Sequence, residues 1–177
     1  RIPVVYHYFY LQENTSTSGT IFDYTWDQLR DVTVFGKNNR TVQTGRISTL
    51  ADILALFCGK IGLEIEIKGP EPEAPERIGA VLNAFRDYWH TFEITSYEPA
   101  LLLAMQKHWM QLDVVQYQAI HHARLAHARA VHLHPTQLSE TVVNAVRHHG
   151  VDIHAWDVND EQSLATITQF GIHRICT

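Results

Sequence analysis

The chain has 177 residues, of which 45% are hydrophobic and 19% are charged, and its formal net charge at pH 7 is −5. This balance is typical of a globular protein with one hydrophobic core, and it argues against a nucleic-acid partner because the 14 Lys and Arg residues are scattered along the sequence. Two cysteines exclude a disulfide framework, and no apolar run approaches the roughly 18 to 20 residues that a membrane span needs. We therefore expect free thiols at Cys58 and Cys176 and a cytoplasmic location.

The first part of the chain alternates apolar runs with polar, turn-rich segments. Residues 4–10 are β-branched and aromatic and predict a strand, whereas residues 12–19 are rich in turn formers. Thr25 and Gln28 have the spacing of a capping box, which predicts the start of a short helix. In chain order, the predicted elements are a strand at 4–10, a helix at 26–32, a polar loop at 37–46, a helix at 50–57 and a strand at 63–68.

The second part alternates helices and strands more regularly. Ile78, Leu82 and Phe85, for example, mark the buried stripe of one helix. The predicted elements are a helix from 75 to about 85, a strand at 91–96, helices at 99–107 and 113–127, a strand at 130–134, a helix at 139–149, a strand at 151–158, a helix at 160–169 and a strand at 172–176. Because strands alternate with helices, the sequence predicts an α/β fold with a parallel sheet and helical crossovers.

One place breaks this alternation. The helices predicted at 99–107 and 113–127 follow each other without a strand between them. Either the fold has a local helical hairpin here, or residues are absent from the sequence at the junction of His108 and Trp109. We favour an absent segment, because the connections elsewhere have regular lengths.

The strand predicted at 63–68 carries charges on one face only. Side chains alternate along a strand, so Glu64, Glu66 and Lys68 share the face opposite to the apolar residues. Buried charges are costly unless they are paired or bound to a metal, and Gly69-Pro70 ends the strand directly after Lys68. The charges therefore lie at the carboxyl end of the strand, where parallel α/β folds build their sites. The alternative is an edge strand with a solvated charged face, and Glu64 is expected to pair with Lys68 or with an adjacent strand.

The 12 histidines make a zinc site a second alternative. His132 and His134 point the same way from a predicted strand, so they could share one metal ion. The other histidines lack consistent spacing on predicted helices. His134 precedes Pro135 at the carboxyl end of its strand, which makes it a candidate for a binding pocket.

Six short motifs occur along the chain in a regular order. They are Val4-Val5-Tyr6-His7, Ile47-Ser48-Thr49-Leu50, Glu64-Ile65-Glu66-Ile67-Lys68, Thr95-Ser96-Tyr97-Glu98-Pro99, Val131-His132-Leu133-His134-Pro135 and His154-Ala155-Trp156-Asp157-Val158-Asn159. In this order the chain resembles the glycerophosphodiester phosphodiesterase family. The resemblance implies a (β/α)8 TIM barrel with a small insertion after the second strand, that is, one domain over 1–177 with an insertion at about 8–46. The family's first two strands have no counterpart here, so we expect strands upstream of Arg1 and an incomplete barrel, with a fifth-strand counterpart also missing at 108/109.

The resemblance also implies roles for individual residues. Glu66 matches a carboxylate that binds a divalent cation, Mg²⁺ or Ca²⁺, and Lys68 matches a catalytic lysine that faces the phosphate. His7 matches a catalytic histidine, and Trp156 matches the aromatic wall of the substrate pocket, to which we also assign His134. Two further metal ligands and a second catalytic histidine are expected upstream.

The implied activity is metal-dependent hydrolysis of glycerophosphodiesters to glycerol 3-phosphate and an alcohol, with a small molecule as the partner. One departure from the family bears on this expectation: Tyr8 follows His7 where the family has an aspartate. The departure keeps open a degenerate barrel that binds a phosphorylated ligand without turning it over. A zinc hydrolase that uses His132 and His134 is the other alternative.

Overall fold

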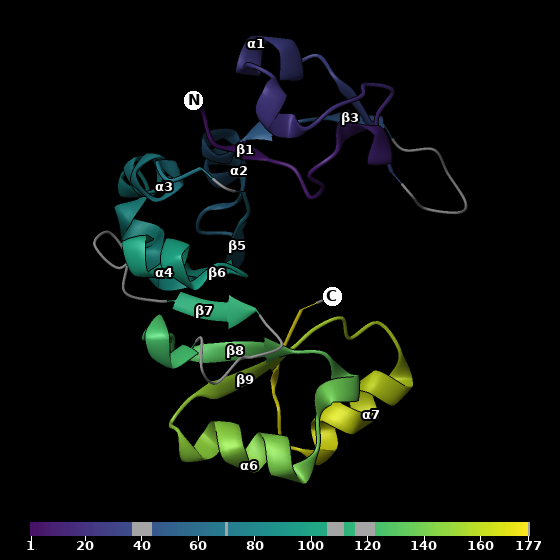
Figure 1. The fold of residues 1–177 in the computed structure, drawn as a ribbon, viewed down its shortest axis with the longest axis vertical. Coiled ribbons are helices and arrows are strands. Elements are labelled where there is room, and N and C mark those ends of the chain that lie inside the picture. The colour runs from purple at the N-terminus through teal and green to yellow at the C-terminus, as the bar shows by residue number, and fades with distance from the viewer. Residues whose placement is uncertain (37–43, 70, 106–111, 116–122, 177) are drawn as a thin grey trace. The chain divides into compact units, whose positions relative to one another are not determined.

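The structure is a computed structural model that describes residues 1–36, 44–69, 71–105, 112–115 and 123–176. The chain divides into two compact units, the first made of Arg1–Ile61 and Glu76–His90 and the second of Gly62–Pro75 and Thr91–Thr177. Figure 1 shows the elements of both units. Within the described ranges, every helix is too short or too polar to cross a membrane.

The first unit consists of short elements around a small core. Strand β1 (Val4–Val5) pairs antiparallel with β4 (Ser48–Thr49), and β2 (Thr33–Phe35) pairs antiparallel with β3 (Thr44–Arg46). The helical elements are η1 (Leu11–Glu13), η2 (Ile21–Asp23), α1 (Trp26–Leu29), α2 (Leu50–Phe57), most of α3 (Ala74–Asn83) and most of η3 (Arg86–Thr91). One buried cluster of this unit consists of Leu11, Leu29 and Ile47, against which partly buried residues such as Val4 and Tyr6 pack.

The prediction of a strand at 4–10 is wrong beyond the first residues of that range. Only Val4–Val5 form a strand, and Tyr10 makes an isolated antiparallel bridge to Thr20. The aromatic side chains of this run find local partners instead of strand neighbours: the Tyr6 hydroxyl donates a hydrogen bond to the carbonyl oxygen of Leu11 at 3.2 Å. The loop predicted at 37–46 is also wrong at its end, since Thr44–Arg46 form β3, while 37–43 lie outside the described residues.

The second unit contains a six-stranded parallel sheet. Its strands are β5 (Leu63–Ile67), β6 (Phe92–Ser96), β7 (Leu112–Val115), β8 (Ala130–Leu133), β9 (Asp152–Ala155) and β10 (Arg174–Ile175). They lie side by side in chain order, and each pair of neighbours is parallel. The helical elements of this unit include α4 (Pro99–Met105), η4 (Pro135–Gln137), α6 (Glu140–His148) and α7 (Glu161–Gln169). This arrangement confirms the predicted α/β fold with a parallel sheet.

Strand β7 corrects the prediction for the segment between α4 and β8. The sequence predicts a helix from 113 and a missing fifth-strand counterpart at His108–Trp109, whereas Leu112–Val115 form a strand that pairs with both β6 and β8. A run of four residues is too short to carry a periodic signal, so the strand is recognised only by its partners. The junction of His108 and Trp109, like the segment 116–122, lies outside the described residues.

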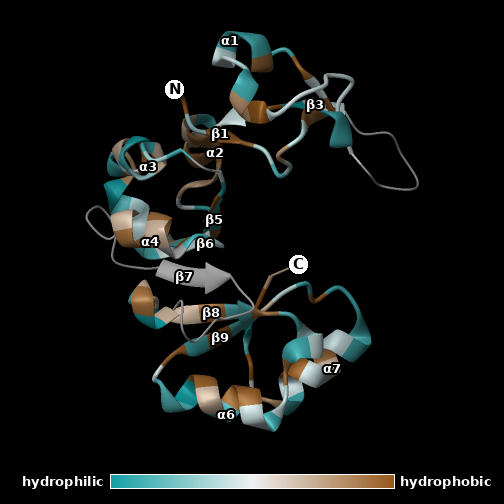
Figure 2. Cartoon of the chain, in the orientation of Figure 1, coloured by the Kyte–Doolittle hydropathy of each residue, from teal (hydrophilic) through white to brown (hydrophobic). Residues whose placement is uncertain are grey.

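The core of the second unit lies between the sheet and its helices. Val143 and Val146 of α6 and Ile167 of α7 are buried there. Figure 2 shows hydrophobic and hydrophilic residues interleaved along both helices, as expected for helices with one face on a core. The buried cluster consists of Ala123, Val131, Leu133, Val143, Val146, Val151, Ile153, Ala155, Val158, Ile167 and Ile172. With the helices on this face, the polar side chains of the strands are left for the opposite face.

Candidate functional site

Polar side chains from neighbouring strands share one face of the parallel sheet. The register places Glu64 of β5 opposite Glu93 of β6, and His132 of β8 opposite His154 of β9. Both histidine side chains are almost fully buried, with 2% and 4% of their surface exposed. Polar groups at such depth need partners to offset the lost hydration, so their contacts define the candidate site.

The carboxyl end of β5 carries an ion pair. Glu66 Oε2 lies 3.1 Å from Lys68 Nζ, and about a quarter of each side chain is exposed. The strand ends at Ile67, and Gly69 follows with a φ of 109°, in a region that residues other than glycine rarely adopt. The structure therefore brings together two of the residues assigned by the resemblance, at the edge of the sheet that the sequence predicts.

The second carboxylate oxygen of Glu66 is available for another ligand. Oε1 is buried and has no hydrogen-bond partner among the residues that the structure describes. An unpaired buried acceptor carries a desolvation cost of roughly 1 to 3 kcal/mol. A hard divalent cation prefers such oxygen ligands and would remove this cost, so Glu66 fits the predicted role of a cation ligand.

His134 and Trp156 lie at the carboxyl ends of the neighbouring strands β8 and β9. Their ring centroids are 6.0 Å apart in an edge-on arrangement. His134 Nδ1 lies 2.7 Å from the hydroxyl of Thr136, at the start of η4. The indole Nε1 of Trp156 is buried, and it has no hydrogen-bond acceptor within the described ranges. The pair thus combines an aromatic wall with an N–H group that is able to donate to a ligand.

His7 belongs to the first unit, in the turn between β1 and η1. Its side chain is exposed, and its ring centroid lies 4.7 Å from that of Tyr8 in an edge-on arrangement. Tyr8 therefore contacts the imidazole directly, at the position where the family has an aspartate. An aromatic ring is a weaker hydrogen-bond acceptor than a carboxylate, so this neighbour differs in chemistry from the one that the resemblance implies.

A series of polar contacts crosses the sheet further from the carboxyl ends of the strands. Glu64 Oε1 lies 3.6 Å from His132 Nδ1, and His132 Nε2 lies 3.2 Å from His154 Nδ1. His154 Nδ1 in turn lies 3.6 Å from Glu93 Oε2. Glu93 also binds two arginines, Arg129, whose Nη2 donates at 2.8 Å, and Arg174. The buried imidazoles thus lie between two carboxylates.

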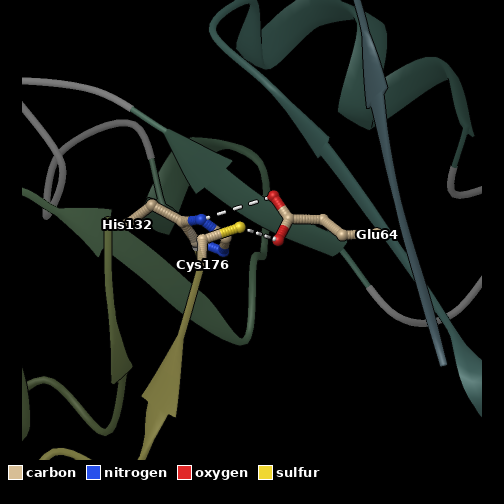
Figure 3. A group of neighbouring side chains, drawn as sticks. All are labelled: Glu64, His132 and Cys176. Atoms are coloured by element: carbon tan, nitrogen blue, oxygen red, sulfur yellow. Dashed lines mark hydrogen bonds and ion pairs between the residues drawn. The ribbon is translucent and has the colours of Figure 1, made fainter. Parts of the chain in front are cut away.

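Cys176 joins this arrangement from the end of β10. Its thiol donates a hydrogen bond to Glu64 Oε2 at 2.7 Å, so one oxygen of Glu64 contacts His132 and the other contacts Cys176 (Figure 3). Burial raises the pKa of the Cys176 thiol to about 12, and the adjacent Glu64 carboxylate adds to the rise. The thiol is therefore protonated at neutral pH, which agrees with its role as a donor.

The predicted partners of Glu64 and of the two strand histidines are only partly right. Lys68 pairs with Glu66 rather than with Glu64, which instead contacts side chains of other strands. His132 faces Glu64 and His154, whereas His134 faces Thr136 and Trp156. Sequence reasoning did not assign Glu93, His154 or Cys176, although each shares the strand parity of the polar face. The alternation of side chains along each strand indicates which residues share a face. Only the register between the strands shows which of them are in contact.

Comparisons with known sequences and with solved structures indicate the same family. The sequence model of the glycerophosphoryl diester phosphodiesterase family matches residues 1–177. The curated protein YhdW of Bacillus subtilis (strain 168), whose name provisionally assigns it to the glycerophosphodiester phosphodiesterases, is 26% identical over 188 residues. The match covers 98% of this chain and 76% of that protein.

Solved structures show the same fold. A phosphodiesterase of Oleispira antarctica, solved in complex with the product sn-glycerol-3-phosphate, matches with a TM-score of 0.77 and 18% identity over 98% of this chain and 74% of that one. A glycerophosphodiester phosphodiesterase of Thermotoga maritima matches with a TM-score of 0.71 and 19% identity over 100% of this chain and 78% of that one. At these identities the likeness establishes the fold.

Proposed function

Because the chain belongs to the glycerophosphoryl diester phosphodiesterase family, we propose that it hydrolyses glycerophosphodiesters to sn-glycerol 3-phosphate and an alcohol. The observation that carries this proposal is the pairing of Glu66 with Lys68 at the carboxyl end of β5. It combines an oxygen ligand for a hard cation with a positive charge for a phosphate, in the part of a parallel α/β fold where active sites lie.

We propose that residues 1–177 belong to one domain of the closed (β/α)8 type, with an insertion at about 8–46. Six parallel strands in chain order support this, since that barrel consists of parallel strands joined by helices in the same sequence. The cytoplasmic location expected from the sequence stays a prediction.

In this proposal Glu66 binds the divalent cation, Mg²⁺ or Ca²⁺, through its buried oxygen Oε1. When bound, such a cation polarises the phosphate and makes a nearby hydroxyl group more acidic. Lys68 holds the other carboxylate oxygen and presents its ammonium group to the phosphoryl oxygens, whose charge increases in the transition state. This preorganised positive charge favours the transition state over the bound substrate.

The remaining proposed residues handle the proton and the substrate. His7 accepts and returns a proton, because an imidazole changes its charge near neutral pH. Trp156 donates its indole N–H to a substrate oxygen, and the rings of Trp156 and His134 form an apolar wall beside it. A buried donor with no acceptor among the described residues is a natural contact for a polar ligand.

Two substitutions test this assignment. Glu66→Gln removes the negative charge that binds a cation, and His7→Ala removes the proton carrier. Each is expected to lower kcat/KM for glycerophosphocholine by more than about 100-fold, the usual loss when acid–base or metal catalysis is removed. The measurement is release of sn-glycerol 3-phosphate, with circular dichroism to show that both variants fold. Glu161→Gln, at an exposed position of α7, is the matched control and is expected to keep wild-type activity. Wild-type turnover by either test variant would contradict the assignment.

A degenerate barrel that binds a phosphorylated ligand without catalysis is the second candidate, because Tyr8 packs against His7 where the family has an aspartate. Calorimetric binding of glycerophosphocholine in the presence of chelator, with no product formed after metal is restored, would favour it. Restoring the family residue with Tyr8→Asp separates the two: a binding protein that has lost catalysis gains turnover, whereas an active enzyme changes by a small factor.

A further inference from the structure

Three glutamates lie on the polar face of the sheet, and they differ in how their charge is balanced. Glu66 pairs with Lys68, and Glu93 pairs with Arg129 and Arg174. Glu64 contacts no Lys or Arg side chain in the part of the chain that the structure describes. Glu64 lies on β5, at one edge of the described sheet, and 29% of its side chain is exposed. Glu64 therefore holds a largely covered negative charge whose only basic neighbour among the described residues is the imidazole of His132.

The groups that do contact Glu64 are good metal ligands. They are an imidazole nitrogen of His132 at 3.6 Å and the thiol of Cys176 at 2.7 Å, and the hydroxyl of Thr95 lies beside them at 3.4 Å from Glu64 Oε1. One ligand atom each from Glu64, His132 and Cys176 lies within 4.8 Å of the others. The three side chains come from β5, from β8 and from the end of β10, so the chain brings them together only in the folded sheet (Figure 3).

We propose that Glu64, His132 and Cys176 form a zinc site that is separate from the oxygen-ligand site at Glu66. The set of one sulfur, one nitrogen and one oxygen atom favours Zn²⁺ over Mg²⁺ and Ca²⁺, which prefer oxygen ligands alone. Three protein ligands leave the fourth position of a tetrahedral zinc ion open to water.

Two separations can be compared with those in a bound zinc site, one to each oxygen of Glu64. With zinc–ligand bonds of about 2.0 to 2.3 Å, ligand atoms of a tetrahedral site lie roughly 3.4 to 3.6 Å apart. The His132 and Glu64 atoms, at 3.6 Å, already have this separation. The Cys176 sulfur and Glu64 Oε2, at 2.7 Å, are held close by the thiol proton. When zinc replaces that proton, which is released to the solvent, the pair opens by roughly 0.9 Å.

His154 provides the second interaction that a zinc-bound imidazole needs. With the metal on Nδ1 of His132, the ring proton lies on Nε2 and is donated to Nδ1 of His154, 3.2 Å away. Such a partner fixes the orientation and tautomer of the ligand, and its removal usually weakens metal binding by about 10- to 100-fold. His154 is thus a positioning residue of the site. The metal in turn supplies the positive charge that Glu64 lacks.

Cobalt binding tests the site without reference to phosphodiesterase activity, so its failure and that of the proposed function can be told apart. The full chain, freed of metal with a chelator, is titrated with Co²⁺ and followed by absorption spectroscopy. Thiolate ligation gives an intense near-ultraviolet charge-transfer band that oxygen ligands do not produce. We expect this band at one equivalent of Co²⁺ and its loss when Zn²⁺ is added. No charge-transfer band in the wild-type chain would overturn the proposal.

The variants identify the ligands. Cys176→Ser is expected to abolish the band, whereas Cys58→Ser, which removes the other cysteine, and Glu66→Gln keep it. Glu64→Gln keeps the shape of the side chain and is expected to weaken Zn²⁺ binding by more than about 100-fold. Loss of a partner that only orients a ligand costs up to about 100-fold, and loss of a ligand should cost more. His154→Ala weakens binding by about 10- to 100-fold with the band retained, and His154→Gln restores part of the affinity. A band that persists in folded Cys176→Ser, or that disappears in Glu66→Gln, would contradict the site.

Discussion

Side chains two residues apart on β5 have different chemistry because their partners differ. Glu66 is held by Lys68, which directly follows β5, whereas Glu64 is held by residues from other parts of the sheet. If Lys68 only balanced the charge of Glu66, it would contribute to the stability of the fold. If it faces the phosphate, it contributes to the rate of hydrolysis.

Lys68→Gln separates these two roles. We expect kcat/KM for glycerophosphocholine to fall by about 100- to 1,000-fold, the cost of removing one preorganised charge or donor from a transition state. Steady-state kinetics with thermal unfolding checks this, and Lys60→Gln, at an exposed position, is the control. A variant that loses thermal stability but keeps its turnover number would show a purely structural role.

Trp156 and Trp89 differ in the hydrogen bonding of their indole N–H groups. Trp156 Nε1 has no acceptor among the described residues, whereas Trp89 Nε1 donates to the carbonyl oxygen of Leu82 at 2.8 Å. A hydrogen bond to a charged group contributes about 1.5 to 3 kcal/mol. Trp156→Phe is therefore expected to raise KM for glycerophosphocholine by at least about tenfold, since about 1.4 kcal/mol corresponds to one factor of ten. Trp89→Phe, which loses an internal hydrogen bond, is expected to leave KM unchanged. Equal KM values for both variants would argue against contact between Trp156 and the substrate.

At the scale of elements, helix boundaries follow local chemistry. Ser139 Oγ accepts a hydrogen bond from the backbone N–H of Val142 at 3.2 Å and begins α6, and Gly150, with a φ of 69°, follows its end. These are the start and stop signals that the sequence contains, and the predicted helix at 139–149 agrees with α6 to within one residue at each end.

Removal of the α6 cap gives a direct test. Ser139→Ala is expected to lower the free energy of unfolding by about 1 kcal/mol, the usual contribution of an N-cap side chain. Urea denaturation measures the change, and Ser139→Thr, which keeps an acceptor oxygen, is expected to recover most of it. If Ala and Thr at this position were equally stable, the side-chain cap would not contribute.

Strand β7 shows where local chemistry is insufficient. Val114 and Val115 favour a strand, but the apolar spacing that continues after them also suits a helix. Only the pairing of Leu112–Val115 with β6 and β8 selects the strand, and that information lies in segments far away in the sequence. The prediction of a long strand at 4–10 fails for the converse reason, because a favourable composition lacks strand partners beyond Val5.

For the whole molecule, the sequence predicts the order of the strands and the face on which each side chain lies better than it predicts contacts between side chains. The alternation of helices and strands predicts the parallel sheet, and parity predicts that Glu64, Glu66 and Lys68 share a face. The contact of Cys176 with Glu64 joins residues 112 positions apart and depends on the register of every strand between them. A single shift of one residue in any of those strands would place its polar side chains on the other face, so no local pattern could have indicated this contact.

The strand order of the sheet has a consequence for biosynthesis. Each of the six strands pairs only with strands that immediately precede or follow it among the strands of the sheet. Among these described strands, each pairing joins elements that are consecutive in the sheet, and closing short connections costs less chain entropy than closing long ones. Nascent chains of this protein can thus extend the sheet from β5 towards β10 as they emerge from the ribosome, with the thiol of Cys176 arriving last.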